Sequence, residues 1–153
     1  MRERTPSARA IGPAVLRGFV LRWNKRSTRD GPASAASRSR PEDLVWGVKY
    51  EVNAEDKNAI DRFEGLGAGY EERRVVVEFD GGPVEAWAHY ATDIDPTIKP
   101  YDWYRDLVIG GAREHSLPEV YIRELEAVPV MEDADRERAG KMRALLAKMG
   151  IVP

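Results

Sequence analysis

The segment between residues 70 and 91 carries the strongest structural signal of this chain, that of a β-hairpin. Apolar and polar side chains alternate along residues 70–79 and again along residues 83–91, which is the pattern of half-buried strands. Asp80-Gly81-Gly82 joins the two stretches, and an Asp-Gly pair is typical of the tight turn between antiparallel strands. The fold must therefore include an antiparallel strand pair at this place.

Further strands are predicted on the N-terminal side of the hairpin. Residues 14–24 indicate a strand interrupted by a bulge-like glycine, Gly18. Residues 27–41 are rich in Ser, Arg, Gly, Ala and Pro, which indicates a loop with a short strand. Residues 44–52 are nearly apolar throughout, and such a run is typical of a central strand.

Helices are predicted between the strands and throughout the second half of the chain. Asn53 is the expected N-cap of a helix over residues 54–63, with Asp56 in the position of a capping-box acid. Two more helices are expected over residues 101–115 and 118–126. The pattern of single strands, one hairpin and late helices predicts an α+β fold, and a closed or nearly closed small barrel with helices on its flank would fit it.

The chain is divided into a domain of residues 1–128 and a charged helical extension of residues 129–153. The extension carries one apolar stripe, formed by Ala139, Met142, Leu146 and Met149. Within the helix expected over residues 101–115, Gly110 and Gly111 each cost about 1 kcal/mol relative to alanine. Such glycines usually mark close packing of the backbone.

Composition limits the chemistry that is available to the chain. It has 153 residues and no cysteine, which excludes thiol nucleophiles, disulfides and thiolate metal sites. Its two histidines, His89 and His115, have no metal-ligand spacing with a partner, and we assign no metal and no cofactor. Any reaction should depend on carboxylates, hydroxyls and backbone amides.

Charge and hydropathy set the expected partners and location. Residues 1–40 hold ten basic and two acidic residues, a net +8, whereas the remainder carries −10. No aromatic platform accompanies the basic residues, so we do not expect nucleic-acid binding. No apolar run approaches the ~18 residues of a membrane span, and no signal peptide is visible, so we expect a cytoplasmic protein.

Glu64 and two tyrosines are the candidate site residues that stand out by position. Glu64 lies at the C-terminal end of a predicted helix, where the helix dipole disfavours an anion and would raise the pKa of a partly buried carboxyl group. Such a group suits general acid/base catalysis, although a solvated acid at a helix end is the alternative. Tyr101 and Tyr104 begin the next helix and are suited either to bind substrate or to pack in the core.

Four segments resemble one family in the same order, the gamma-glutamylcyclotransferase-like family. They comprise residues 12–24, residues 45–50 (Val-Trp-Gly-Val-Lys-Tyr), residues 60–65 (Ile-Asp-Arg-Phe-Glu-Gly) followed by Tyr70, and residues 100–121 with Gly-Ala-Arg-Glu and Leu-Pro-Glu-Val-Tyr. The resemblance covers about residues 1–125 and implies a small mixed barrel flanked by helices.

The resemblance also implies a function and a set of site residues. Glu64 matches the acid/base of the family, and Tyr104 and Tyr70 match tyrosines at its substrate pocket. The implied reaction cyclises a gamma-glutamyl amine, a gamma-glutamyl amino acid or glutathione to 5-oxoproline without a cofactor, and releases the free amine. The alternative is a catalytically impaired member that binds a small molecule or a protein.

The N-terminus departs from the family pattern. Residues 2–8 resemble the segment that follows the family's Tyr-Gly-Ser-Asn loop, whose backbone amides hold the substrate carboxylate. We expect that the natural protein continues upstream of Met1 with that strand and loop. A barrel without this strand exposes a sheet edge, through which two copies are expected to associate.

Overall fold

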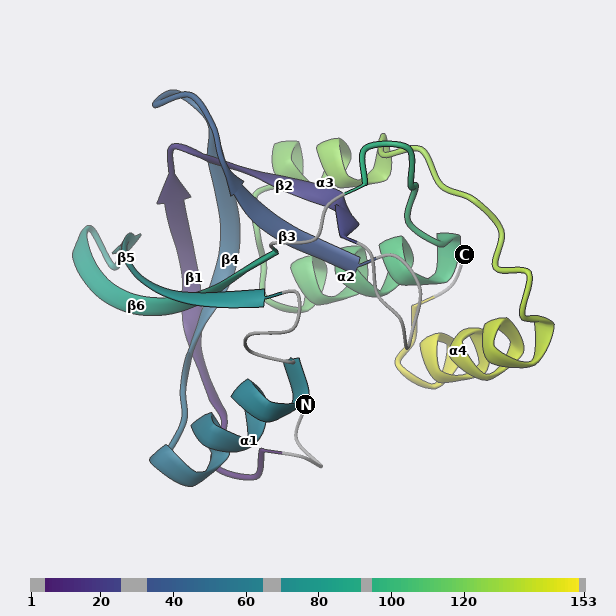
Figure 1. Ribbon diagram of the computed structural model, residues 1–153, viewed down its shortest axis with the longest axis horizontal. Coiled ribbons are helices and arrows are strands. Elements are labelled where there is room, and N and C mark those ends of the chain that lie inside the picture. The colour runs from purple at the N-terminus through teal and green to yellow at the C-terminus, as the bar shows by residue number, and fades with distance from the viewer. Residues whose placement is uncertain (1–4, 26–32, 65–69, 92–94, 152–153) are drawn as a thin grey trace. The chain divides into compact units, whose positions relative to one another are not determined.

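The computed structural model describes residues 5–25, 33–64, 70–91 and 95–151, which form two compact units. The first unit, unit 1, comprises Met1–Arg22 and Ala35–Ile94, and the second, unit 2, comprises Trp23–Ser34 and Asp95–Pro153. The described residues form six strands and four helices, which Figure 1 labels where there is room.

The strands form one mixed sheet with the order β2-β3-β6-β5-β1-β4. Its members are β1 (Arg9–Arg17), β2 (Phe19–Lys25), β3 (Ala33–Arg38), β4 (Leu44–Glu51), β5 (Tyr70–Phe79) and β6 (Gly82–Ala91). Strands β3 and β6 pair in parallel, with Ala36 opposite Tyr90, whereas β1 pairs antiparallel with β4 and β5, and β5 pairs antiparallel with β6. The α+β class with a mixed sheet is therefore confirmed, in the form of a half-barrel with four helices.

The predicted hairpin forms as expected. Strands β5 and β6 pair in register from Tyr70 opposite Ala91 to Phe79 opposite Gly82. The two residues between them, Asp80 and Gly81, have φ angles of 50° and 80°. Both lie in the left-handed region that a two-residue hairpin turn requires, which explains the Asp-Gly pair.

The strand expected over residues 14–24 is two strands, and the bulge lies elsewhere. Gly18 has a φ of 77° and separates β1 from β2, with its N–H donating to the Asp43 carbonyl (2.8 Å). The register irregularity of the β1–β4 pair falls between Ala10 and Gly12. The chain thus changes direction at Gly18 between the two strands. Glycine suits this position because a left-handed φ has a higher conformational energy in a residue that carries a side chain.

The prediction that residues 44–52 form a central strand is wrong. Strand β4 stands at the end of the strand order and, among the described strands, pairs with β1 alone. Its residues Leu44 to Lys49 are half-buried rather than fully buried. The core of unit 1 instead comes from the apolar side chains of the other strands: Ala14, Val15, Phe19, Val77 and Tyr90.

Unit 2 contains three helices that share one apolar core. They are α2 (Asp102–Glu114), α3 (Glu119–Glu126) and α4 (Arg136–Lys148). The buried side chains in this unit are Trp23, Trp103, Ile109, Ala112, Leu117, Tyr121, Ile122, Leu125 and Leu146. Of the predicted stripe on α4, Leu146 is buried, Ala139 and Met142 are half-buried, and Met149 is exposed.

The two adjacent glycines of α2 differ in their surroundings. A Cβ atom added to Gly110 would lie 2.1 Å from Cδ1 of Ile151, whereas one added to Gly111 would meet no described atom within 4 Å. Close packing is therefore confirmed for Gly110 but not for Gly111. The residues after α4 lie against the α2 backbone at this point.

Candidate functional site

The three site residues predicted from the sequence fall in different units. Glu64 is the last residue of α1 (Ala54–Glu64) and Tyr70 is the first residue of β5, both in unit 1, whereas Tyr104 lies in α2 of unit 2. The side chains of Glu64 and Tyr70 lie outside the described residues. Contacts of neighbouring side chains position the backbone segments that carry these three residues.

The N-terminus of α1 is held by two side chains. The Asn53 side-chain oxygen accepts a hydrogen bond from the backbone N–H of Asp56 (2.8 Å), which confirms the predicted N-cap. Asp56 does not complete a reciprocal capping box, because its carboxylate accepts from the backbone N–H (2.7 Å) and hydroxyl (2.5 Å) of Ser7. The Ser7 hydroxyl in turn accepts from the Asn53 N–H (3.0 Å), so a residue of the N-terminal segment joins the cap.

The C-terminal half of α1 is tied to the hairpin by four side chains, here called the α1-end network. Lys57 Nζ donates to Asp61 (2.5 Å) on the same helix and to Glu72 (2.6 Å) on β5. The other oxygen of Asp61 lies 3.1 Å from Nε2 of His89 on β6. Asp61 is three residues before Glu64, so the network fixes the helix end that carries the candidate acid/base.

The α1-end network is half-buried, and its charges stabilise one another. Side-chain exposures are 27% for Lys57, 17% for Asp61, 14% for Glu72 and 22% for His89. Burial alone would raise the pKa of Asp61, but the hydrogen bonds from Lys57 and His89 outweigh it and lower that pKa. The pKa of Lys57 is raised, because its bonds to Asp61 and Glu72 outweigh burial, which acts in the opposite direction.

Among the described residues, three members of this network also have the spacing of a metal-ion site. Ligand atoms of Asp61, Glu72 and His89 lie within 4.8 Å of one another. The Lys57 ammonium already bonds both carboxylates, so a metal ion would have to displace a cation that the protein itself supplies. We therefore interpret the cluster as a positioning network. The sequence did not reveal it, since its members come from three separate elements.

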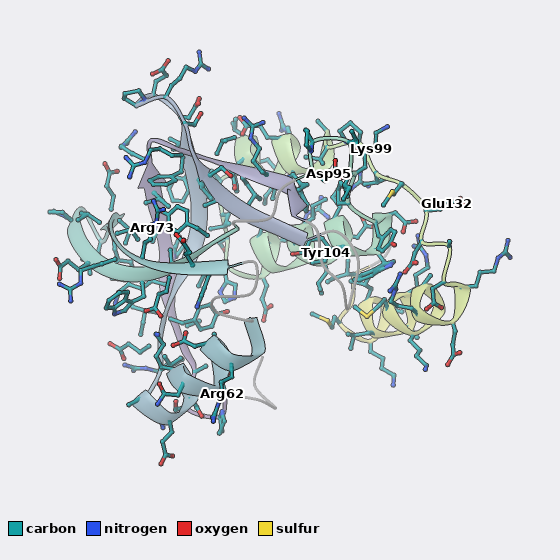
Figure 2. The ribbon with its side chains drawn as sticks, viewed as in Figure 1. Arg62, Arg73, Asp95, Lys99, Tyr104 and Glu132 are labelled. Atoms are coloured by element: carbon teal, nitrogen blue, oxygen red, sulfur yellow. The ribbon has the colours of Figure 1, made fainter. Side chains whose placement is uncertain are left out.

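The outer surface of α1 differs from the side that faces the hairpin. Figure 2 shows Arg62 on α1 and Arg73 on β5, and both side chains are exposed. Trp87 of β6 is 56% exposed and lies beneath two cations, with Lys57 Nζ 5.7 Å and Arg74 5.2 Å from the ring centroid. The cation–π contact with Trp87 is a further interaction by which the hairpin stabilises the position of Lys57.

Tyr104 occupies an aromatic cluster in unit 2. Its ring meets those of Trp23 (centroids 6.1 Å apart) and Trp103 (5.9 Å) edge to face. Trp103 is buried and donates from its indole N–H to Asp133 (3.0 Å). The Tyr104 ring is half-buried, so the local packing is compatible with both interpretations of this residue, packing and substrate binding.

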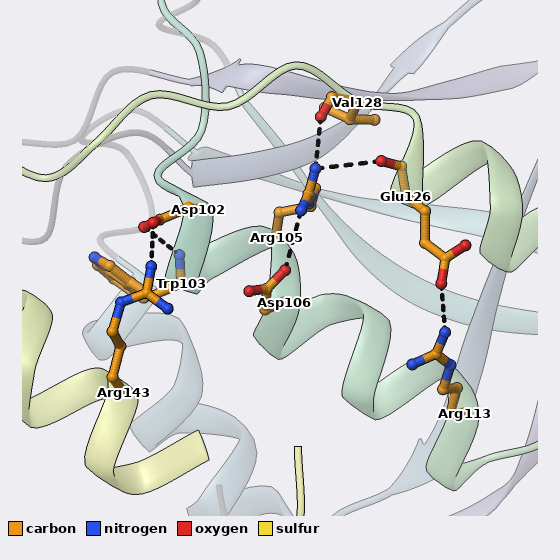
Figure 3. A network of polar contacts seen from close by, with 8 residues as sticks. All are labelled: Asp102, Trp103, Arg105, Asp106, Arg113, Glu126, Val128 and Arg143. Atoms are coloured by element: carbon orange, nitrogen blue, oxygen red, sulfur yellow. Dashed lines mark hydrogen bonds and ion pairs between the residues drawn. The ribbon is translucent and has the colours of Figure 1, made fainter. Parts of the chain in front are cut away.

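The helix that carries Tyr104 is held by polar contacts in its first turn and, near its C-terminal end, by an ion pair between Arg113 and Glu126 of α3 (Figure 3). Asp102, the first residue of α2, pairs with Arg143 of α4 and accepts from the Trp103 N–H (2.7 Å). Arg105 donates to the carbonyls of Glu126 (3.2 Å) and Val128 (3.1 Å), where a cation satisfies the carboxyl end of α3. The position of Tyr104 within unit 2 is therefore well determined.

Known proteins resemble this chain in both sequence and fold. A family model described as the AIG2-like family matches residues 44–125. Gamma-glutamylcyclotransferases of Bos taurus and Homo sapiens are each 28% identical to the chain, over 130 and 134 residues, which is 82% of this chain and 69% of each relative. A solved gamma-glutamyl cyclotransferase structure matches with a TM-score of 0.82 at 24% identity, over 94% of this chain and 89% of that chain.

These comparisons confirm the family resemblance that the motifs indicated. The matched range, residues 44–125, includes α1 with Glu64, the hairpin with Tyr70 and α2 with Tyr104. Within the parts of the chain that the structure describes, no helix has both the length and the apolar character needed to cross a bilayer.

Proposed function

Because the chain belongs to the AIG2-like family, we propose that it is a gamma-glutamylcyclotransferase with Glu64 as its general acid/base. The relatives that carry this name share 28% identity with it over most of its length. The observation that carries the assignment of Glu64 is its place at the end of α1, three residues after Asp61 in the α1-end network. A catalytic group needs such a rigid support.

The proposed reaction needs one proton acceptor that later becomes a donor. The α-amino group of a gamma-glutamyl compound is protonated at neutral pH and cannot attack until a base removes a proton. The Glu64 carboxylate takes that proton, the amine nitrogen attacks the γ-carbonyl carbon, and a five-membered ring closes. The protonated Glu64 then gives its proton to the leaving nitrogen as the old amide bond breaks, and the ring nitrogen gives up its second hydrogen as a proton, which the released amine takes up; the products are 5-oxoproline and the free amine in its protonated form.

The remaining requirement is orientation of a flexible substrate. Ring closure needs the amine and the carbonyl to be held about 3–3.5 Å apart, an effect that can supply several kcal/mol. We assign this task to Tyr104 and Tyr70, whose hydroxyls can bind the polar groups of the substrate. The proposed substrate class is a gamma-glutamyl amine, a gamma-glutamyl amino acid or glutathione.

The test is release of 5-oxoproline by the wild-type protein and by Glu64→Gln. This change keeps the size of the side chain and removes its basicity, so the rate should fall by at least about 10²-fold. Glu55→Gln is the matched control, because Glu55 is an exposed acid in the first turn of the same helix. Thermal melting of both variants should stay close to that of the wild type.

The outcomes separate the two functions considered. Retention of most activity by Glu64→Gln contradicts the assignment of this residue. If the wild-type protein binds gamma-glutamyl compounds in calorimetry but releases no 5-oxoproline from any of the three substrate types, it is a binding module rather than an enzyme.

A further inference from the structure

Unit 1 contains a cleft of about 200 Å³ that is lined by four arginines, here called the arginine cleft. Its arginines are Arg17, Arg38, Arg73 and Arg74, and its floor includes the rings of Phe19 and Tyr90. The proposed reaction uses none of these residues. Four positively charged side chains around one small cleft favour the binding of an anion.

Two of the arginines lie over aromatic rings. The Arg38 guanidinium lies 5.5 Å from the Phe19 ring centroid, and that of Arg73 lies 5.1 Å from the Tyr90 centroid. The two rings also contact each other, with centroids 5.4 Å apart. A guanidinium over a ring face can still direct N–H donors from its edge towards an oxyanion.

The charges of the cleft are only partly balanced. Arg17 is paired with Glu78 (2.5 Å), Arg73 with Glu71 (3.2 Å), and Arg74 weakly with Glu85 (3.9 Å). Arg38 forms no ion pair with any residue that the structure describes. The cleft therefore has a surplus of positive charge, and at least one guanidinium is available to a ligand.

Tyr90 gives an independent indication that the cleft binds a ligand. Only 7% of this residue is exposed, yet its hydroxyl forms no hydrogen bond within the described residues. Burial raises the pKa of Tyr90, and the charges of Arg73 and Arg38 oppose that shift, so both cations act on the phenol. The hydroxyl oxygen is not among the buried polar atoms of the described residues that lack a partner, so it remains accessible from the cleft that Tyr90 lines and can donate to a bound acceptor.

We propose that the arginine cleft binds a small oxyanion, the phosphate or carboxylate group of a small molecule. Arg38 and Arg73 supply charged N–H donors, and the Tyr90 hydroxyl supplies a neutral donor from the floor of the cleft. These groups come from β3, β5 and β6, so the site is built by the sheet itself. The anion completes the hydrogen bonding of Tyr90 and balances the charge of Arg38.

The first experiment is a titration of the ¹⁵N-labelled protein with inorganic phosphate, and separately with succinate, at constant ionic strength. We expect saturable shifts of the amide signals of residues 38, 73 and 90 with at least one of the two anions. Arg38→Gln should weaken that binding about tenfold, the effect of losing one charge-assisted contact. Arg62→Gln removes an exposed cation on α1 and should leave the affinity unchanged.

Tyr90→Phe tests the floor of the cleft without changing its packing. Loss of one neutral hydrogen bond should weaken binding about fivefold. Equal weakening by Arg38→Gln and Arg62→Gln would overturn the proposal, since it would indicate general charge attraction. So would the absence of saturation with both anions, or binding of a single-stranded oligonucleotide in their place. None of these outcomes depends on 5-oxoproline release, so the proposed function is tested separately.

Discussion

Each unit contains an ionic network that joins two or more helices or strands. The two networks differ in how far they are closed, that is, in how completely their charged groups are buried and already hydrogen-bonded to one another. In unit 2, Asp133 accepts two bonds from Arg138 (both 2.6 Å), one from the Trp103 indole (3.0 Å) and one from the Asp135 N–H (3.0 Å). The Asp133 side chain is fully buried. In unit 1, the α1-end network is half-buried and connects its members in series.

This difference indicates different roles. A buried carboxylate with four donors has no capacity left for a ligand and holds Trp103 and α4 in place, so Asp133 is structural. The α1-end network instead transmits the position of the hairpin, through Asp61, to the helix turn that ends in Glu64. Closed networks should therefore govern stability, and the open network should govern rate as well.

The largest effect is expected from breaking the closed network. Asp133→Asn removes the charge that balances Arg138, and loss of one partner from a buried pair costs about 3 kcal/mol. Urea unfolding measures this loss, and Glu132→Gln, an exposed neighbour, should stay within about 0.5 kcal/mol of the wild type. At temperatures where the variant is folded, its rate of 5-oxoproline release should be unchanged. A large loss of rate would contradict the division of roles.

Acid should weaken the same network by a slightly smaller amount. The hydrogen bonds from Arg138 outweigh burial and, with that from Trp103, lower the pKa of Asp133 to about 2. Because the folded pKa is below the unfolded value of about 3.9, this stability is present above pH ~4 and lost as pH falls towards 2, roughly 2.5 kcal/mol in all. Unfolding free energies of the wild type and Asp133→Asn should converge over this pH range. Parallel curves would contradict the prediction.

The open network should show a mixed effect. Asp61→Asn leaves Lys57 with Glu72 only, so we expect about 1 kcal/mol of lost stability and, through displacement of Glu64, a rate about tenfold lower. The effect on rate distinguishes it from Asp133→Asn. Because Asp61 acts through Glu64, the pH–rate profile should shift as well, and Asp61→Glu should restore part of the rate. An unchanged profile and rate would make the network purely structural.

The smallest effect is expected at Tyr104, which neighbours the closed network through Trp103. Tyr104→Phe keeps both ring contacts and removes one hydroxyl, so it should weaken substrate binding or rate by about 1 kcal/mol. Steady-state kinetics and a melting curve measure the two quantities. If affinity and rate stay unchanged, Tyr104 is a packing residue.

Features that depend on neighbouring residues were predictable from the sequence. The hairpin turn at Asp80-Gly81 and the Asn53 cap each follow from the chemistry of a few adjacent positions, and both form as expected. The motif around Glu64 also correctly located a helix end. Whether Glu64, Tyr70 and Tyr104 form the site remains a prediction.

Features that depend on distant residues were not predictable. The apolar run of β4 resembles a central strand, but strand order is decided by pairings between remote segments, which place it at the end of the sheet. Asp61 meets His89 across 28 positions, and nothing local marks the two as partners. Arg38 and Tyr90 meet in the arginine cleft for the same reason, because β3 pairs with β6.

The contact between Gly110 and Ile151 has a consequence for how the chain can change during evolution. Any side chain at position 110 would overlap the Ile151 side chain, while a smaller residue at position 151 would leave a gap over the α2 backbone. Alanine at position 110 therefore requires a smaller side chain at position 151. Positions 110 and 151 should therefore covary among related sequences, although 41 residues separate them.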